Sequence, residues 1–218
     1  HLVNEGKNPH NGISGFSFNE DGDVFFGLGE NLGKDYSLVG SDGSVISGGG
    51  EGGSIFKMLA DGSRLQRYAT GFWNPYRTTF DAFGRMFMVD NDADSRPPCR
   101  LNHVVPNGDF GYRFKYGRKG LHPYTSWNGE NPGMLPMASG VGDGPSGVLA
   151  YESTHLPSDY LGGVFVTAAW IHNRLEFHRL IADGASFRTE MTVIIQGDDN
   201  FRPISITTAP DGSLYMTD

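Results

Sequence analysis

The chain has 218 residues, a formal net charge of −8 and an aromatic fraction of 12%. An acidic chain is a poor binder of nucleic acid, because phosphate contacts need clustered Lys and Arg. The aromatic content argues against disorder, and no apolar run approaches the ~20 residues that a membrane span requires. The one cysteine, Cys99, excludes an internal disulfide and any zinc site built from several cysteines.

Glycine and proline set the expected fold class. The chain contains 32 Gly and 12 Pro, and the glycines interrupt every stretch that has helical periodicity. Many short strands joined by Gly-rich turns are typical of an all-β protein.

One phrase recurs along the chain, as FNEDGDVFFG at 18–27, FDAFGRMFMVD at 80–90 and TAPDGSLYMTD at 208–218. Each predicts a β-hairpin whose turn is built on Gly22, Gly84 or Gly212, because Gly tolerates positive φ. The separations are 84 − 22 = 62 and 212 − 84 = 128, which is twice 64. A period of about 63 residues indicates a repeat architecture.

Two longer segments, 55–90 and 175–218, share a wider pattern. Both read as a strand, an ADG turn, a second strand, an aromatic-x-Pro corner and the recurrent hairpin, and Pro75 and Pro203 are 203 − 75 = 128 residues apart. Four strands per repeat, arranged radially, predict a β-propeller blade. The alternative, a two-sheet sandwich, does not show this spacing.

The segment 96–147 lies between these repeats and is rich in Gly, Pro and aromatic residues. It predicts a long loop that either covers one face of the propeller or packs its own aromatic side chains. Its Trp127, like Trp170 further on, would then either stack on a sugar ring or fill the space between blades. The chain begins at His1 and stops after a strand-like segment at Asp218, so we expect a piece of a longer protein.

Several motifs resemble the soluble quinoprotein glucose/sorbosone dehydrogenases, namely HNGISGFSFNEDGDVFFGLGE, GFWNPYRTTFD and GPSGVLAYE. The phrase at 89–130 is similar to a membrane-bound dehydrogenase branch of planctomycete-type bacteria, whose members often carry a C-terminal cytochrome c domain. The resemblance implies a six-bladed propeller that uses pyrroloquinoline quinone (PQQ) with Ca²⁺ outside the cytoplasm, in the periplasm or extracellularly. At about 63 residues per blade, residues 1–218 would form a single domain of three to four blades, truncated at both ends.

The resemblance also implies a catalytic pair. His10, in the HNG motif, stands where the family has the base that removes the substrate hydroxyl proton, and Glu30 stands one residue beyond the place of its carboxylate partner. A His with an ordinary pKa near 6.5 suits a general base at neutral pH, and a carboxylate would orient the imidazole. The alternative is that His10 is a polar loop residue.

The cofactor prediction comprises Trp73, Asn74, His172 and Arg202. PQQ carries three carboxylates, so its pocket needs Arg and Lys. GFWNP retains the family's Asn as Asn74 but has Trp73 in place of an Arg, and NFRP retains one Arg as Arg202. His172 lies where the family has a Lys. Either another group supplies the positive charge or the pocket serves another ligand.

A DxDxD run at Asp90, Asp92 and Asp94 follows a predicted strand and offers the oxygen ligands that Ca²⁺ prefers. The alternative is a solvated acidic turn that pairs with Arg96 and Arg100.

Three functions follow as hypotheses. The first is a sugar or polyol dehydrogenase that passes electrons to a cytochrome c domain or partner. The second is a non-catalytic propeller that binds carbohydrate or protein, and the third is a Ca²⁺-dependent hydrolase or lactonase.

Overall fold

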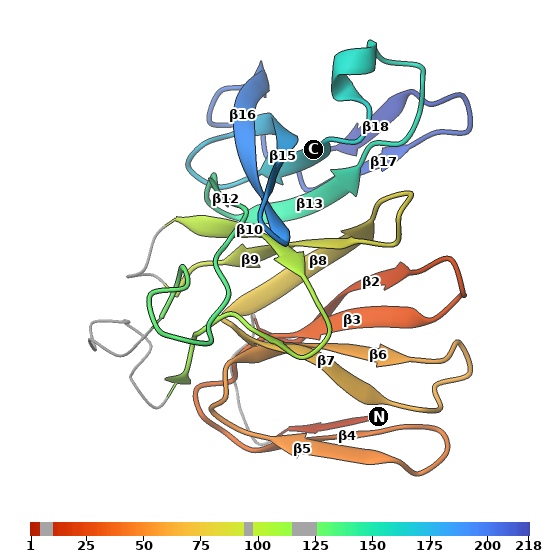
Figure 1. Cartoon of the computed structure of the whole chain (residues 1–218), viewed down its shortest axis with the longest axis vertical. Coiled ribbons are helices and arrows are strands. Elements are labelled where there is room, and N and C mark those ends of the chain that lie inside the picture. Colours follow the sequence, from red (N-terminus) through yellow and green to blue (C-terminus); the bar gives the residue numbers. More distant parts are fainter. Residues whose placement is uncertain (5–10, 94–97, 115–125) are drawn as a thin grey trace.

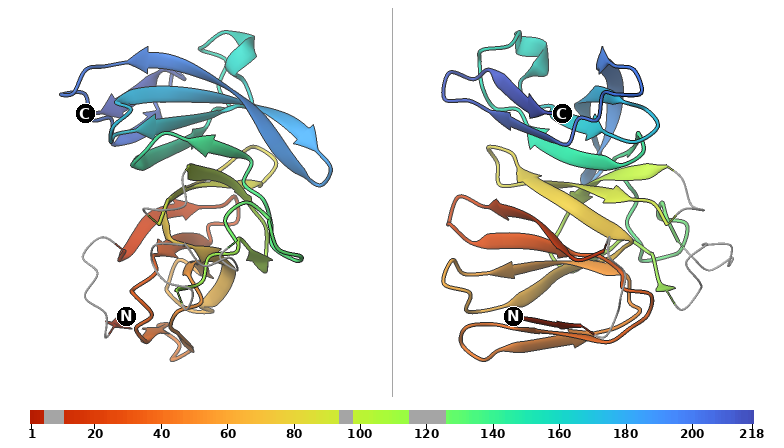
Figure 2. Two further views of the ribbon diagram at one scale, coloured as in Figure 1. Left: turned by 90° about the vertical axis from the view of Figure 1, so that its left-hand side faces the viewer. Right: turned by 180° about the vertical axis from the view of Figure 1, so that it is seen from behind.

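The structure, a computed structural model, describes residues 1–4, 11–93, 98–114 and 126–218. These residues form an all-β protein built of several antiparallel sheets that are layered one beside the next (Figure 1). Figure 2 shows the same layers from two further directions, fanned around a common side of the molecule. The described residues contain no helix long and apolar enough to cross a membrane.

The first blade is an antiparallel sheet in which the order of strands in space follows the chain. Its strands are β2 (Ile13–Phe18), β3 (Val24–Leu28), β6 (Gly53–Met58) and β7 (Gln66–Phe72). A two-residue strand, β11 (Gly108–Asp109), pairs with β7 in parallel at its outer edge.

The second and third blades repeat this order. The second consists of β8 (Asn74–Phe80), β9 (Met86–Asn91), β10 (Cys99–Val104) and β12 (Ser139–Val141). The third consists of β13 (Pro145–Ala150), β14 (Val164–Ala168), β15 (Arg174–Asp183) and β16 (Ser186–Gln196). A last hairpin, β17 (Ser205–Thr208) and β18 (Leu214–Thr217), has the position of the first two strands of a fourth blade.

A small sheet packs on the outer side of the first blade. It consists of β1 (Leu2–Asn4), β4 (Tyr36–Val39) and β5 (Val45–Gly48). Leu38 and Tyr36 of this sheet share an apolar cluster with Phe26 and Phe56 of the blade. This sheet was not predicted from the sequence.

The apolar core lies between the blades, as in a propeller. Phe25 and Ile55 of the first blade pack with Met86 and Met88 of the second. A second cluster joins the second and third blades, and a third joins the third blade to the last hairpin. Each sheet thus buries both faces, which explains why the inner strands β3, β9 and β14 read as nearly continuous apolar runs.

The first strands of successive blades lie side by side and are joined by repeated hydrogen bonds. Ser14 Oγ donates to the Pro75 carbonyl oxygen at 3.2 Å, and Ser146 Oγ donates to the Pro203 carbonyl oxygen at 3.3 Å. A longer link passes over the third blade, because Arg77 Nη1 on β8 of the second blade donates to Ser205 Oγ on β17 of the last hairpin at 2.9 Å. The predicted all-β class and the predicted four-stranded antiparallel sheets are therefore confirmed.

The predicted turns are present, with φ values of 81° at Gly22, 72° at Gly84 and 86° at Gly212. In the third blade the short turn is replaced by the connection 151–163, which contains a 3₁₀ helix at Ser158–Tyr160. This replacement explains why the second interval in the sequence is twice the first. The repeat read from the sequence does not start where a blade starts. Its first two strands are the last two strands of one blade, and its hairpin forms the first two strands of the next blade.

The segment 96–147 is not one long loop. Within it, β10, β11 and β12 are strands of the first two blades, and β13 begins at Pro145. The residues from Phe110 to Ala138 that the structure describes form the excursion proper, and they bury Phe110, Tyr112 and Trp127. Of the two alternatives for this segment, these residues show the one in which it packs its own aromatic side chains.

Candidate functional site

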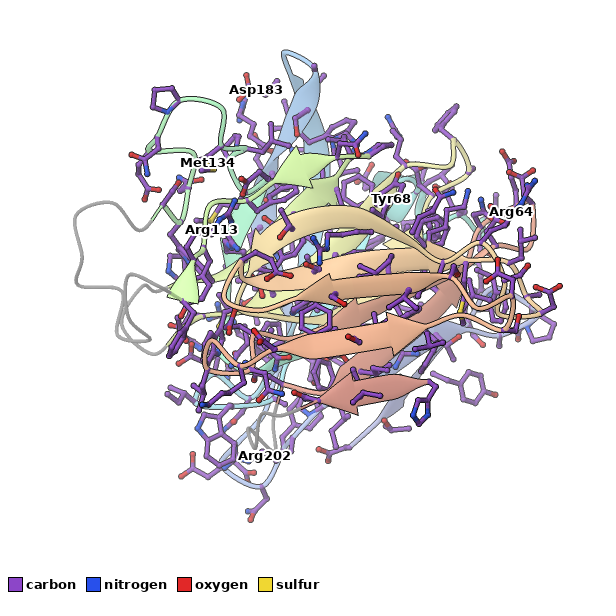
Figure 3. All side chains as sticks on the ribbon, turned by 90° about the horizontal axis from the view of Figure 1, so that it is seen from below. Arg64, Tyr68, Arg113, Met134, Asp183 and Arg202 are labelled. Atoms are coloured by element: carbon purple, nitrogen blue, oxygen red, sulfur yellow. The ribbon has the colours of Figure 1, made fainter. Side chains whose placement is uncertain are left out.

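The predicted site residues that the structure describes lie at one end of the blades, which we call the mouth. At this end the first strand of each blade begins and the second strand ends. It is the left side of Figure 1, and the turns that join first to second strands lie on the right. Asn11 precedes β2, Asn74 opens β8, Gly144 precedes β13 and Arg202 precedes β17. In Figure 3, Arg113 marks this end, whereas Arg64 of the β6–β7 connection lies at the opposite end.

Asn11 joins the first two blades at the mouth. It is buried, and its Nδ2 donates to the Glu30 carbonyl oxygen at 2.7 Å and to the Trp73 carbonyl oxygen at 3.4 Å. The Asn of the HNG motif therefore has a structural role. His10, the predicted base, lies outside the described residues.

Glu30 is buried, and its carboxylate accepts hydrogen bonds from the backbone of two separate loops. Its Oε1 accepts the Gly33 N–H at 2.7 Å, and its Oε2 accepts the Gly52 N–H at 3.0 Å. Burial raises the pKa of Glu30, and the hydrogen bonds from these backbone N–H groups oppose that rise. A carboxylate has about four lone-pair sites, so each oxygen can accept a further donor.

Asp90 is fully buried in an ion pair with Arg100. Its Oδ1 accepts the N–H groups of Asn74 at 2.8 Å and Trp73 at 3.2 Å, while its Oδ2 accepts Arg100 Nη2 at 2.6 Å and Nε at 3.2 Å. These bonds use all the acceptor sites of the carboxylate. Burial raises the pKa of Asp90, against the opposing effect of the Arg100 guanidinium. Asp90 therefore has no free acceptor site with which to bind Ca²⁺. It pairs with Arg100, as the alternative expected, but the pair is buried and does not lie in a solvated turn.

Arg100 extends this network to the excursion. Its Nη1 donates to the carbonyl oxygens of Phe110 and Trp127, each at 2.8 Å, and its Nη2 donates to the Gly71 carbonyl oxygen at 3.1 Å. Its guanidinium carbon lies 3.6 Å from the centre of the Trp127 ring. A planar five-donor group is suited to join so many acceptors.

Trp73 packs into the core. Its side chain is 3% exposed and meets Tyr112 edge to face, with ring centres 5.4 Å apart. The ring lies in a cluster with Ala93 and Trp127. In this arrangement Trp73 does not present a free face on which a planar quinone could stack.

The mouth contains an uncharged cavity of about 230 Å³ between the second and third blades. Its lining consists of Asn74, Tyr76, Asn91, Gly144, Pro145 and Ser146. Asn74 Oδ1 is buried and has no hydrogen-bond partner among the described residues. Amide and hydroxyl groups of this kind recognise neutral hydroxyl-bearing ligands.

Beside this cavity lie Asp92, Cys99 and Asp143, whose ligand atoms are within 4.8 Å of one another. Cys99 Sγ donates to Asn91 Oδ1 at 3.2 Å, and burial raises the pKa of its thiol. The thiol also donates to Asp143 Oδ1 at 3.5 Å. Asp94, the third acidic residue of the predicted metal site, lies outside the described residues.

His172 and Arg202 occupy the third and fourth blades at this end. His172 Nδ1 accepts the Asp143 N–H at 3.0 Å. Arg202 Nη1 donates to Asn173 Oδ1, and its guanidinium lies 5.3 Å from the centre of the Trp170 ring. Figure 3 shows Arg202 at the margin of the molecule, apart from Arg113.

A buried polar chain in the third blade was not predicted. Glu176 Oε1 accepts Arg174 Nε at 2.7 Å, and Glu176 Oε2 lies 3.0 Å from His178 Nε2. Hydrogen bonds from His178 and Arg174 lower the pKa of Glu176, although burial acts to raise it. The signal was the R-x-E-x-H spacing, which puts all three side chains on one face of a strand.

The described donors do not fit the three carboxylates of PQQ. Arg100 is committed to Asp90 and Arg174 to Glu176, and Arg202 Nη1 is bonded to Asn173. The cavity itself is lined by uncharged groups. A tri-anion would need several free cations there.

Comparison with known families decides the relationship. The family model of a domain of unknown function, DUF7133, matches residues 3–218. The chain belongs to the DUF7133 family. Comparison of the sequence with curated proteins gives no match.

The DUF7133 chain is similar in fold to sugar dehydrogenases of known structure. An oxidoreductase (glucose dehydrogenase) from Thermus thermophilus superposes with a TM-score of 0.61 at 15% identity, over 95% of this chain and 77% of that one. The PQQ-bound form of an aldose sugar dehydrogenase from Streptomyces coelicolor superposes with a TM-score of 0.56 at 17% identity, over 97% and 76%. At these identities the likeness establishes the propeller-type fold.

Proposed function

We propose that the mouth is the substrate site of an oxidoreductase that acts on a sugar or polyol. Two observations support this proposal. The fold is shared with sugar dehydrogenases, and the cavity between the second and third blades is lined by amide and hydroxyl groups.

Asn74 is the observation that carries the proposal. Its buried Oδ1 has no partner among the described residues, although buried acceptors are normally satisfied by protein, water or ligand. This oxygen lies beside Gly29 of the first blade and is closed to solvent, whereas Asn74 also lines the cavity, where its amide group would meet the hydroxyl groups of a sugar or polyol. The ion pair of Asp90 with Arg100 holds the Asn74 backbone in place.

His10 is proposed as the base, because it directly precedes Asn11 in the chain and Asn11 lies at the mouth. It would take the hydroxyl proton of the substrate, and Glu30 would stabilise the resulting imidazolium. The carbinol hydrogen would leave as hydride to a quinone-type two-electron acceptor, and the electrons would pass from that acceptor to a cytochrome c domain or partner in the periplasm or outside the cell. No step is assigned to PQQ, because the described donors do not fit it.

Calorimetry on the full chain tests the substrate site. Monosaccharides and their alditols should bind to the wild type, and Asn74→Ala should weaken binding roughly tenfold, which corresponds to the loss of about one buried hydrogen bond. Asn200→Ala is the matched control, because this amide is exposed. Absence of binding across the panel would overturn the proposal.

A non-catalytic sugar-binding propeller is the second candidate, favoured by the pairing of Arg100 and Arg174 with buried carboxylates. Reduction of an electron-accepting dye by bound sugar, assayed with and without added PQQ and Ca²⁺, separates the two. Dye reduction would support the dehydrogenase, and sugar binding without dye reduction in either assay would support the binding module.

A further inference from the structure

Only one of the three tryptophans in the chain is accessible to solvent. Trp73 and Trp127 are 3% and 2% exposed, whereas Trp170 is 63% exposed. Trp170 lies in the connection between β14 and β15, at the mouth end of the third blade. The sequence left open whether Trp170 fills the space between blades, and its exposure shows that it does not.

The backbone of Trp170 is fixed against one wall of the cavity. The Trp170 N–H donates to the Asp143 carbonyl oxygen at 3.0 Å, and the Ala169 N–H donates to the Gly144 carbonyl oxygen at 3.3 Å. A Cβ added to Gly144 would lie 2.6 Å from the Trp170 Cβ. Because Gly144 lines the cavity, the Trp170 side chain leaves the backbone next to this wall.

Arg202 holds the indole by lying 5.3 Å from its ring centre. Asn173 Oδ1 accepts Arg202 Nη1, so the guanidinium is itself fixed. A cation at this distance is attracted by the negative face of the ring. The indole is thus supported by the cation while most of its surface stays open to solvent.

The next residue, Ile171, has a strained backbone. Its φ is 62°, and its side chain is 68% exposed. A β-branched residue in this region is an outlier that persists only where the surroundings impose it. An exposed Trp–Ile pair held in this way is not explained by packing.

We propose that Trp170 is a stacking platform for the ring of a cyclic sugar whose hydroxyl groups meet the amide and hydroxyl side chains of the adjacent cavity; this inference rests on the function proposed above. The C–H groups on one face of a pyranose form a flat, weakly positive surface that complements the negative face of an indole. An acyclic polyol with the same number of hydroxyl groups has no such face. Trp170 is therefore a specificity-determining residue that favours cyclic over open-chain ligands.

The test compares binding of the methyl pyranosides of glucose, galactose and mannose with binding of the corresponding alditols. In the full chain, Trp170→Ala should weaken pyranoside binding roughly three- to tenfold and leave alditol binding within about twofold. Trp170→Phe, which keeps an aromatic face, should restore most of the lost affinity. Phe83→Ala is the matched control, because Phe83 is also exposed and covered by an arginine, Arg85, but lies in the β8–β9 turn at the opposite end of the blade.

Fluorescence gives a second readout that does not depend on the alanine variant. Since Trp170 is the exposed tryptophan, bound pyranoside should protect the wild type from acrylamide quenching. Equal pyranoside affinity in the wild type and Trp170→Ala, or unchanged quenching on binding, would overturn the inference and leave the proposed function standing. Binding of neither ligand class to the wild type would overturn both.

Discussion

At the scale of single residues, buried charges organise the mouth. Asp90 and Arg100 are each fully buried and together bond to the backbone of the β7–β8 corner and of the excursion. The sequence predicted Asp90 as a metal ligand because its spacing from Asp92 is typical of oxygen ligands. It could not show that the carboxylate points inward, where every acceptor site is already used.

Arg100→Met should destabilise the chain by about 3–5 kcal/mol, because it leaves the Asp90 charge buried without its partner. Urea unfolding followed by far-ultraviolet circular dichroism measures this change. Arg179→Met is the matched control: Arg179 pairs with Glu190 on the exposed side of the third blade, and such pairs contribute about 0–1 kcal/mol. Similar losses in the two variants would contradict the assigned role of Arg100.

Glu30→Gln should change how stability depends on pH. Burial raises the pKa of Glu30 above its ordinary value of 4.5, so the native state binds the proton more tightly than the unfolded state. The stability that this group contributes is present below pH 4.5 and lost as pH rises through the native pKa. Relative to the wild type, the Gln variant should therefore gain stability as pH increases from about 4 to 8. A pH-independent difference in the free energy of unfolding would refute the raised pKa.

At the scale of elements, alternation in the sequence predicted the hairpins but not every strand. The turns at Gly22, Gly84 and Gly212 were predicted correctly, because the repeated phrase puts a glycine at each turn and each of these glycines has a positive φ. The strand β10 was missed because two of its fully buried residues, Arg100 and Asn102, are polar. Polar residues at buried positions remove the apolar pattern by which a core strand is predicted. Such burial depends on partners that are distant in the chain.

Gly29→Ala should disrupt the mouth through a close approach between the first two blades. An added Cβ would lie 2.6 Å from the Asn11 Cβ and 2.9 Å from Asn74 Oδ1. We expect sugar binding measured by calorimetry to fall at least tenfold, with a lower thermal midpoint. Gly12→Ala is the control, because no atom lies within 4 Å of its added Cβ, although Gly12 belongs to the HNG motif. Equal damage in both variants would show that this contact is not the cause.

At the scale of the whole molecule, the blades form an arc with its apolar clusters between layers (Figure 1). The repeat in the sequence predicted this arrangement, because each sheet can bury its faces only against a neighbour. The candidate site was predicted less well. Asn74 and Arg202 lie at the mouth as expected, but the inward packing of Trp73 depends on Tyr112 and Trp127, which no local pattern connects to it.

Hydrogen exchange should follow this layering. Amides of β9 and β14, whose residues are almost all buried, should exchange most slowly, and those of β16, most of whose residues are exposed, should exchange faster by roughly two orders of magnitude or more. Mass spectrometry of peptic fragments measures the difference. Uniform protection across the third blade would contradict the expectation.

The hydrogen bonds between first strands have a mechanical consequence. Apart from the short β11–β7 pairing, which ties the β10–β12 connection of the second blade to the first blade, no backbone ladder of the described strands runs from one blade to the next. The links between neighbouring first strands are side-chain bonds such as Ser14 to Pro75 and Ser146 to Pro203. Under tension applied at the two ends of the chain, the blades should therefore peel away one at a time. Each rupture would lengthen the polypeptide by roughly 200 Å, the contour length of about 60 extended residues.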